Sequence, residues 1–332
     1  MRVAAVQFFA TPFDLTRNLE TVERLARQAA AQGARLIVLP ELFNNGYVYT
    51  QRLTASAEGE DGATLRFLAN LSAELKAIIG GTLLLRENGR IFNTFALVEP
   101  NGKIHKYRKQ FPFLWEHLYF DAGNAPLIAE TELGRIGLMT CWDLAHRCAW
   151  ESYRGRADIL IIASAPPRFH LAVLNFPLGK KIYLAQMVAS LLRDREAIDR
   201  WYFDDVASGA AQYGLPVVHA VMSGRFVTEV PLPRLSFFAA ALTQPKLWPL
   251  AGQAHLATLR ATFYGTSAIF SAEGETLAKV DGEEGVAVAD VDFGAAHDLS
   301  PPRRSGYLLP KIPFQLRLLE WLMKMAGGMY RR

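Results

Sequence analysis

The chain has 332 residues, 51% of them hydrophobic and 20% charged, with a formal net charge of +4. This composition is ordinary for a globular protein, and the length suits one large α/β domain or two smaller ones. The mild charge, with no basic stripe among aromatic residues, argues against nucleic-acid binding, and two cysteines cannot form a disulfide scaffold.

The amino-terminal sequence MRVAAVQFFATPFD is interpreted as a buried strand over residues 2–8 rather than as a signal peptide. Gln7, Pro12 and Asp14 interrupt its apolar run, and no small-residue cleavage site follows. No uncharged stretch reaches the roughly 18 residues that a membrane-spanning helix needs. We therefore expect a cytoplasmic protein.

Strands and helices alternate along the next part of the chain. Residues 16–33 predict an amphipathic helix because apolar residues recur at helical spacing, with Thr16 as its cap and Gly33 at its end. A strand over residues 35–40 and a second amphipathic helix over residues 62–77 follow. This alternation predicts an α/β fold.

The rest of the chain predicts more strands than helices. Residues 78–89 and 90–109 are expected to be antiparallel strands joined by the turn sequences ENG and PNG. Parallel and antiparallel signals are therefore mixed. Further strands and a late hairpin are expected over residues 135–140, 158–163, 215–222, 265–280 and 284–292.

Two apolar stretches, residues 165–206 and 228–258, break this rhythm and are interpreted as insertions into a single domain that spans residues 1–310. Residues 311–332 are expected to form a C-terminal helical tail. The polar residues of this tail form only a narrow stripe, so most of its surface should be covered by this chain, a partner subunit or a lipid surface.

The sequence GLMTCWD places Cys141 at the end of a buried strand, directly before an aromatic residue and Asp143. A cysteine in an apolar strand is most often a small core residue. At a strand end, however, a tight turn can present the thiol beside backbone N–H groups that hold an oxyanion. A reactive thiol also needs a base or a positive charge beside it.

Two other strand ends offer such partners. Glu41, in LPELFNNGY, follows a buried strand and its terminating proline, where it could act as a general base. Lys109 abuts the aromatic segment QFPFLWE, which would desolvate it and strengthen its field; the alternative is a solvated cation in a basic run. Glu116, between Trp115 and His117, lies either on a surface loop or in a pocket.

The segments that carry Glu41, Lys109 and Cys141 follow one another along the chain in the order typical of the carbon–nitrogen hydrolase (nitrilase) superfamily, and each resembles a segment of that family. LPELFNNGY is similar to the segment that carries the family's base, and GLMTCWD is similar to its nucleophile segment. KYRKQFPFLWE resembles its lysine segment, with Pro112 and Glu116 at the family's positions. Weaker similarity in YGTSAIFSAEGETLA, GVAVADVDF and RRSGY extends the resemblance over residues 1–310, except the two insertions.

The resemblance implies a four-layer αββα sandwich of the nitrilase type and a Glu41–Lys109–Cys141 triad. Glu41 would be the general base and Cys141 the nucleophile that forms a thioester or thioimidate. Lys109 would stabilise the tetrahedral intermediate, with the backbone N–H of Trp142 as a second donor. No metal or organic cofactor is required, and the seven scattered histidines lack the paired spacing of a zinc site. Substrate-binding residues are expected at Glu116, Trp142, Tyr47, Phe113 and Ser164.

The chain departs from the family pattern directly after Asp143. The family usually continues with a Pro-Glu pair and then an arginine, whereas this chain continues LAHRCAWESYR. His146 and Arg147 either face the site or lie on a solvated helix face, and Cys148 is expected to be a packing residue. The shape of the pocket therefore stays open at this point.

The favoured function is hydrolysis of a linear amide or an N-carbamoyl compound, with release of ammonia or an amine. A nitrile substrate is the alternative within this class, and acyl transfer to an amine would use the same triad. Relatives that act on nitriles more often carry glutamate where this chain has Asp143, which weakly favours the amide.

A second hypothesis is a membrane-surface or scaffold protein that retains the fold. The apolar insertions, the tail and the basic terminus MYRR motivate it, and the complete triad argues against it. Peripheral membrane contact therefore stays open but is not favoured. The expected partners are a small-molecule substrate and further copies of the chain, in a homodimer or a higher homo-oligomer.

Overall fold

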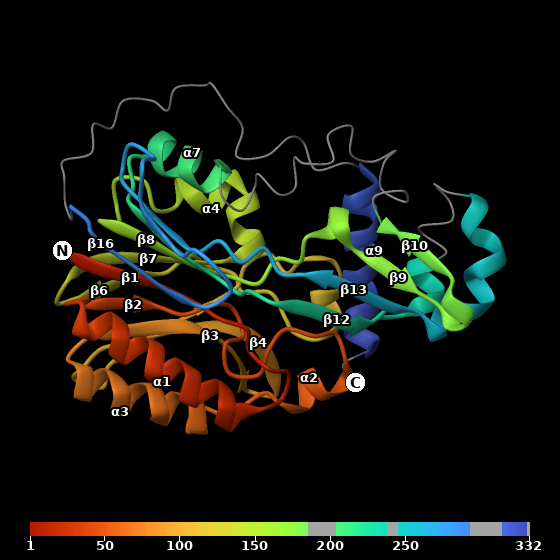
Figure 1. The fold of residues 1–332 in the computed structure, drawn as a ribbon, viewed down its shortest axis with the longest axis horizontal. Helices are drawn as coiled ribbons and strands as arrows, with labels where there is room; N and C mark the ends of the chain where they lie inside the picture. Colours follow the sequence, from red (N-terminus) through yellow and green to blue (C-terminus); the bar gives the residue numbers. More distant parts are fainter. Residues whose placement is uncertain (185–203, 238–244, 293–313, 331–332) are drawn as a thin grey trace.

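The computed structural model describes residues 1–184, 204–237, 245–292 and 314–330. Within these residues, two six-stranded sheets are stacked on each other, and helices cover their outer faces (Figure 1). The layers are therefore helix, sheet, sheet and helix, which confirms the predicted αββα sandwich.

The first sheet carries the amino-terminal half of the fold. Its strand order is β16-β1-β2-β3-β4-β5, in which β1, β2 and β3 are parallel and the other neighbours are antiparallel. Helices α1 and α3 lie against its outer face (Figure 1). The bounds are β1 (Arg2–Gln7), α1 (Leu15–Ala31), β2 (Leu36–Val38), α3 (Ala63–Leu75), β3 (Ile78–Glu87), β4 (Arg90–Val98), β5 (Ile104–Arg108) and β16 (Gly285–Asp290).

The second sheet has the order β15-β14-β11-β8-β7-β6, with β7, β8 and β11 parallel. Helices α4 and α7 cover its outer face (Figure 1). The bounds are β6 (Ile128–Thr131), β7 (Gly134–Thr140), α4 (Arg147–Glu151), β8 (Ile159–Ser164), α7 (Asp204–Tyr213), β11 (Val217–Val221), β14 (Ala268–Phe270) and β15 (Thr276–Lys279).

An apolar core fills the space between the two sheets. Val3, Val38 and Ile78 of the first sheet share one buried cluster with Leu138 and Ile161 of the second. The central strands are hydrophobic along most of their length because helices or the opposite sheet cover both of their faces. This burial fixes the positions of the strand ends and of the loops that follow them.

The ends of α1 show one wrong prediction and one correct one. Asp14, not Thr16, is the N-cap, and its carboxylate accepts the backbone N–H of Arg17 at 3.2 Å. The helix begins two residues earlier than predicted because the side chain of Asp14 satisfies this free N–H group. Gly33 follows the helix with a φ of 87°, a left-handed conformation that favours glycine.

A smaller sheet of order β10-β9-β13-β12 extends from the sandwich (Figure 1). The described parts of both predicted insertions contribute to it, so residues far apart in the sequence pair within one sheet. The domain limits 1–310 stay a prediction, and residues 185–203 and 238–244 lie outside the described parts. The bounds are η3 (Phe169–Leu171), β9 (Val173–Asn175), η4 (Pro177–Gly179), β10 (Lys181–Tyr183), β12 (Arg225–Glu229), η5 (Pro245–Leu256) and β13 (Thr258–Thr262).

The C-terminal tail contains α9 (Phe314–Tyr330), which packs against the short helix η1 (Leu114–Leu118). Trp321 and Met325 on its outer side are 55% and 59% exposed, whereas Met323 is buried. The helix is therefore covered on one side by its own chain. In the described parts of the chain, we find no helix with the length and apolarity that crossing a bilayer requires.

Candidate active site

Three strand ends meet at one edge of the sandwich. Glu41 lies three residues after β2, Lys109 directly follows β5, and Cys141 directly follows β7. Strands β2 and β5 run in the same direction, because β3 is parallel to β2 and two antiparallel pairings lead from β3 to β5. The fold thus brings these side chains close together.

Lys109 lies between two carboxylates and is fully buried. Its Nζ donates to Glu41 Oε1 at 2.9 Å and to Glu116 Oε1 at 2.8 Å. Burial alone would lower the pKa of Lys109, but Glu116 and Glu41 raise it well above its usual value. The ammonium is therefore held charged inside the protein.

Glu41 is held by donors from three separate segments. Besides Lys109, the side-chain amide of Asn93 donates to Oε1 at 2.8 Å, and the backbone N–H of Ala165 donates to Oε2 at 3.0 Å. Asn93 belongs to β4, and Ala165 directly follows β8. The carboxylate thus links the two sheets, and its orientation is fixed before any substrate binds.

Glu116 begins a chain of hydrogen bonds that leads away from Lys109. It accepts the backbone N–H of Phe113 at 2.6 Å and the hydroxyl of Tyr47, whose oxygen lies 2.9 Å from that of Tyr49. Burial raises the pKa of Glu116 to about 7; Lys109 opposes this shift. Glu116 is fully buried, which excludes the surface-loop interpretation.

Cys141 is buried and has an uncommon backbone conformation. Its φ of 47° lies in the left-handed region, which side-chain-bearing residues rarely adopt and which is often found at functional sites. Burial raises the pKa of its thiol well above the usual value, and Glu41 adds to the shift, whereas Lys109 opposes it. The resting sulfur is therefore a thiol that needs a base, rather than a preformed thiolate.

Asp143 ties the cysteine turn to the lysine segment. Its Oδ2 accepts the backbone N–H of Thr140 at 2.9 Å and the hydroxyl of Tyr107 at 2.7 Å, and its Oδ1 accepts the N–H of Phe111 at 2.9 Å. Burial raises the pKa of Asp143 to about 6, while Lys109 and these donors oppose the shift. The short helix η2 (Cys141–Ala145) is thus anchored to the loop after β5.

Trp142 and Phe113, both predicted to bind substrate, lie beside each other. Their ring centroids are 4.5 Å apart in an edge-to-face arrangement. The indole N–H of Trp142 donates to Glu320 Oε1 of α9 at 3.1 Å. The tail helix therefore contacts the residue that directly follows the candidate nucleophile.

Four other residues that the sequence analysis named, Ser164, His146, Arg147 and Cys148, lie outside the hydrogen-bonded Glu41–Lys109–Glu116 group. The hydroxyl of Ser164 lies 2.8 Å from His219 Nε2, so this side chain is engaged by β11, and its neighbour Ala165 contacts Glu41 instead. The ring of His146 is half-buried and stacks on Phe111 with the ring centroids 3.8 Å apart, whereas Arg147 is exposed. The packing role predicted for Cys148 is wrong because its side chain is exposed.

Sequence reasoning missed three contributors to the site: Asn93, Tyr49 and the N–H group of Ala165. A polar residue within the apolar strand RIFNTFALV was a detectable signal for Asn93. The other two depend on contacts that no local pattern records. In the described residues, no group of three or more His, Cys, Asp or Glu is arranged to hold a metal ion.

Comparisons with known proteins show the family of this chain. The sequence profile of a family described as carbon-nitrogen hydrolase matches residues 2–189. N-carbamoylputrescine amidase of Arabidopsis thaliana is 26% identical over 303 residues, or 88% of this chain and 86% of that protein. A Pyrococcus abyssi nitrilase is 29% identical and omega-amidase YafV of Escherichia coli K12 is 33% identical, each over 147 residues, or 43% of this chain. The matched region spans 56% of each of these two proteins, about half of their length.

Solved structures share the fold. An amidase from Nesterenkonia sp. superposes with a TM-score of 0.63 at 20% identity, covering 87% of this chain and 89% of the amidase. XC1258 from Xanthomonas campestris, a carbon–nitrogen hydrolase superfamily protein, has a TM-score of 0.61 at 20% identity, with the same coverage of each chain. These similarities extend beyond residue 189 and thus cover the second half of the sandwich.

Proposed function

We propose that this chain, which belongs to the carbon–nitrogen hydrolase family, is a thiol hydrolase that cleaves the C–N bond of a linear amide or an N-carbamoyl compound. The observation that carries this proposal is the fully buried Lys109 between Glu41 and Glu116 at the strand ends that also carry Cys141. A buried cation, a base and a thiol at one edge are the groups that acyl transfer through cysteine requires.

The first half-reaction would form the acyl-enzyme. As Sγ of Cys141 attacks the carbonyl carbon, its proton passes to Glu41 and a C–S bond forms. Lys109, with the backbone N–H of Trp142 as a second donor, would stabilise the oxyanion of the tetrahedral intermediate. Glu41 then gives the proton to the leaving nitrogen, and the C–N bond breaks. The raised pKa of Cys141 supports proton transfer during attack, because a resting thiolate is disfavoured.

The second half-reaction would return the enzyme to its resting state. Glu41 takes a proton from water, and the resulting hydroxide attacks the thioester carbon. The C–S bond then breaks, the carboxylic acid leaves, and Sγ regains the proton from Glu41. Glu116 would hold Lys109 in place through both steps, since it accepts a hydrogen bond from the ammonium.

The names of the relatives support the amide or carbamoyl class for the substrate. N-carbamoylputrescine amidases match over most of this chain, and omega-amidases match over part of it. In one variant of the Nesterenkonia amidase, the acetamide moiety of fluoroacetamide is covalently attached to the active-site cysteine. A nitrilase among the relatives keeps a nitrile substrate as the alternative outcome of the test.

A substrate panel tests this proposal. The wild-type protein, Cys141→Ala and Cys148→Ala would be incubated with short linear amides, N-carbamoyl amino acids and nitriles, and ammonia or amine release would be measured. We expect turnover of an amide or carbamoyl compound by the wild type and Cys148→Ala, and none by Cys141→Ala. Turnover of nitriles alone would overturn the substrate class, and turnover by Cys141→Ala would overturn the mechanism.

A further inference from the structure

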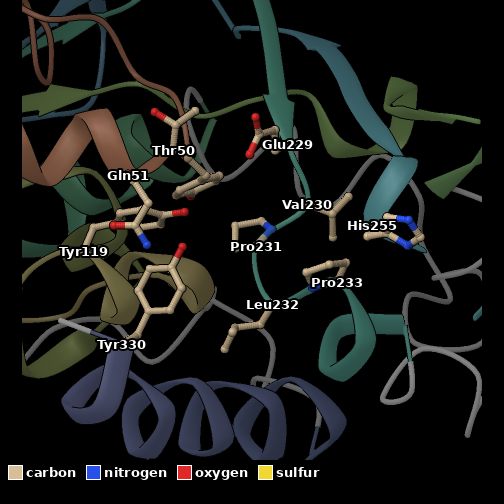
Figure 2. A pocket seen from close by; sticks show the side chains of 11 residues that line it. Thr50, Gln51, Tyr119, Glu229, Val230, Pro231, Leu232, Pro233, His255 and Tyr330 are labelled. Carbon is tan, nitrogen blue, oxygen red and sulfur yellow. The ribbon is translucent and has the colours of Figure 1, made fainter. Parts of the chain in front are cut away.

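A cavity of about 210 Å³ lies beside the candidate active site, between the end of β12, the turn before α2 (Gln51–Ala55) and the end of α9 (Figure 2). It is smaller than the roughly 300–1,000 Å³ of pockets for drug-sized ligands. Its size therefore suits a short aliphatic or similarly small ligand. All of the residues that line it are described by the structure, and none of them belongs to the Glu41–Lys109–Cys141 group.

Three tyrosines form an aromatic wall of this cavity. The rings of Tyr49 and Tyr119 are stacked at 5.7 Å, and Tyr330 meets Tyr119 edge-on at 5.8 Å. Figure 2 shows Tyr119 and Tyr330 on one side of the opening and Pro231 to Pro233 on the other. The negative faces of aromatic rings attract organic cations, and they do so most strongly where water is excluded.

One carboxylate lies at the rim of the cavity. Glu229 is exposed at the end of β12, and the structure shows no hydrogen bond or ion pair for its carboxylate within the described residues. Its charge contributes to the raised pKa of the Tyr119 hydroxyl, after burial and Tyr330, which places it within electrostatic reach of the aromatic wall. The described lining contains no lysine or arginine that would neutralise Glu229, and His255 is the other titratable side chain beside the tyrosines.

One lining residue of the cavity, Thr50, has a buried hydroxyl, Oγ1, without a hydrogen-bond partner in the described part of the chain. Thr50 occupies the N-cap position of α2, yet its side chain makes no capping bond. A buried hydroxyl without a partner is costly, and a turn of the Thr50 side chain toward the cavity would let this oxygen accept from a ligand N–H group.

The cavity is connected to the candidate catalytic residues by hydrogen bonds. Tyr49 lines the cavity, its hydroxyl lies 2.9 Å from that of Tyr47, and Tyr47 donates to Glu116, which accepts from Lys109. A ligand that moves Tyr49 would therefore act on the carboxylate that holds the catalytic ammonium. A ligand bound in the cavity could thus change the reaction rate through these hydrogen bonds.

From these contacts, we propose that the cavity is a binding site for a small primary alkylammonium ion, held by Glu229, the three tyrosine rings and the hydroxyl of Thr50. The cation has two potential sources: the remote end of a substrate that reaches from Cys141 into the cavity, or a separate amine that binds beside the substrate. The chemistry of recognition is the same in both cases. The effect on turnover rests on the proposed hydrolase function, whereas binding itself does not.

Isothermal titration with n-butylammonium chloride tests binding without turnover. We expect saturable binding to the wild type and to Cys141→Ala, and at least about tenfold weaker binding to Glu229→Gln, which loses a charge-assisted contact. Glu273→Gln, an exposed carboxylate on another turn, is the matched control and should bind as the wild type does. Absence of binding to the wild type, or equal binding to Glu229→Gln, would overturn the proposal.

Two further experiments identify the source of the cation and test whether the tyrosine rings contribute to binding. Butylammonium that inhibits competitively against an amide with a cationic end indicates the substrate's own tail; an effect on kcat with a neutral amide indicates a separate amine. Tyr119→Leu should weaken binding, and n-butanol should not bind; binding of butanol as tight as that of butylammonium would contradict a cation site. If no substrate turns over, the titration still decides the ammonium site, so the two proposals fail separately.

Discussion

The edge that holds Glu41, Lys109 and Cys141 and the small sheet of β9, β10, β12 and β13 are built in opposite ways. At the edge, the carboxylate of Glu41 receives donors from β4, from the segment after β5 and from the segment after β8. In the small sheet, alternate residues of β12 are exposed, and backbone pairing to β13 holds the strand in place. One region fixes polar groups inside a core, and the other presents side chains to its surroundings.

This difference shows where chemistry and selectivity can reside in the molecule. Buried charges must keep their partners, because removal of one partner leaves an uncompensated charge. Exposed side chains on a strand can change at little cost to folding. We therefore expect changes at the sheet edge to affect turnover and stability together, and changes at exposed positions of the small sheet to affect ligand preference alone.

The largest effect is expected for Lys109→Met. The change removes the cation between Glu41 and Glu116, so unfolding should become about 3–5 kcal/mol easier, and turnover should fall by at least roughly 10³-fold. Chemical denaturation and initial rates measure these effects. Lys106→Met is the matched control because Lys106 pairs with the exposed Glu60, and its stability should stay within about 0.5 kcal/mol. A Lys109→Met variant as stable and as active as the wild type would contradict the view that the buried charges at the sheet edge determine both stability and turnover.

The next effect is a pH dependence of stability at Glu116. Burial raises its folded pKa to about 7 from 4.5, so between these values the native state keeps a proton that the unfolded chain has lost. The free energy of unfolding should therefore fall as pH rises through this window, by roughly 3 kcal/mol in total, and change no further above it. Glu116→Gln should remove this slope. An unchanged slope in Glu116→Gln would show that another group, such as Asp143, is responsible.

Asp143→Asn should have a smaller effect, which should appear in both the stability of the protein and its turnover. An asparagine has one NH₂ group where the aspartate has an accepting oxygen. That NH₂ group would point at a donor, either the N–H of Phe111 or the donors of Thr140 and Tyr107, so the free energy of unfolding should fall by about 2 kcal/mol. The turn that carries Cys141 loosens, so we expect a drop in kcat larger than any change in KM. The alkylation rate of Cys141 by iodoacetamide should change too. Asp281→Asn, on the surface, is the control and should leave the stability, kcat and alkylation rate unchanged.

The smallest effect is expected for Glu320→Ala on the tail helix. The indole N–H of Trp142 loses its acceptor, which should lower stability by about 1 kcal/mol. Thermal unfolding measures this change. Lys324→Ala on the same helix and Val227→Ala on the small sheet are exposed controls that should stay within about 0.5 kcal/mol. A control as destabilised as Glu320→Ala would argue against a specific role for the contact.

Much of the sandwich follows from local sequence patterns. The central strands are apolar over their length, and the sequences ENG and PNG end the strands of the first sheet as predicted. Glu41 and Cys141 could be selected because each follows such a strand, and Lys109 could be selected because it lies between a predicted strand and an aromatic segment. The N-cap of α1 was misplaced because Asp14 and Thr16 are both good caps, and only the three-dimensional structure shows which of them meets a free N–H.

The contacts of the site could not be predicted in the same way. Asn93 and Ala165 reach Glu41 across sequence separations of 52 and 124 residues. The first contact depends on the strand order of the first sheet, and the second depends on how the two sheets stack. Strand β9, from the first insertion, pairs with β13, which begins where the second insertion ends, and local patterns do not record this pairing. Cys148 resembled a core residue, but the phase of α4 exposes it, because Ala149 and Trp150 face inward instead.

The most direct measurement of the central claim is the mass of the intact protein, quenched rapidly during turnover of an amide substrate. The account predicts a mass increase equal to the acyl group in the wild type and in Cys148→Ala, and no increase in Cys141→Ala. Peptide mapping should place the adduct on Cys141. An adduct on Cys148, or substrate turnover by Cys141→Ala, would contradict covalent catalysis at the strand end where Lys109 and Glu41 meet.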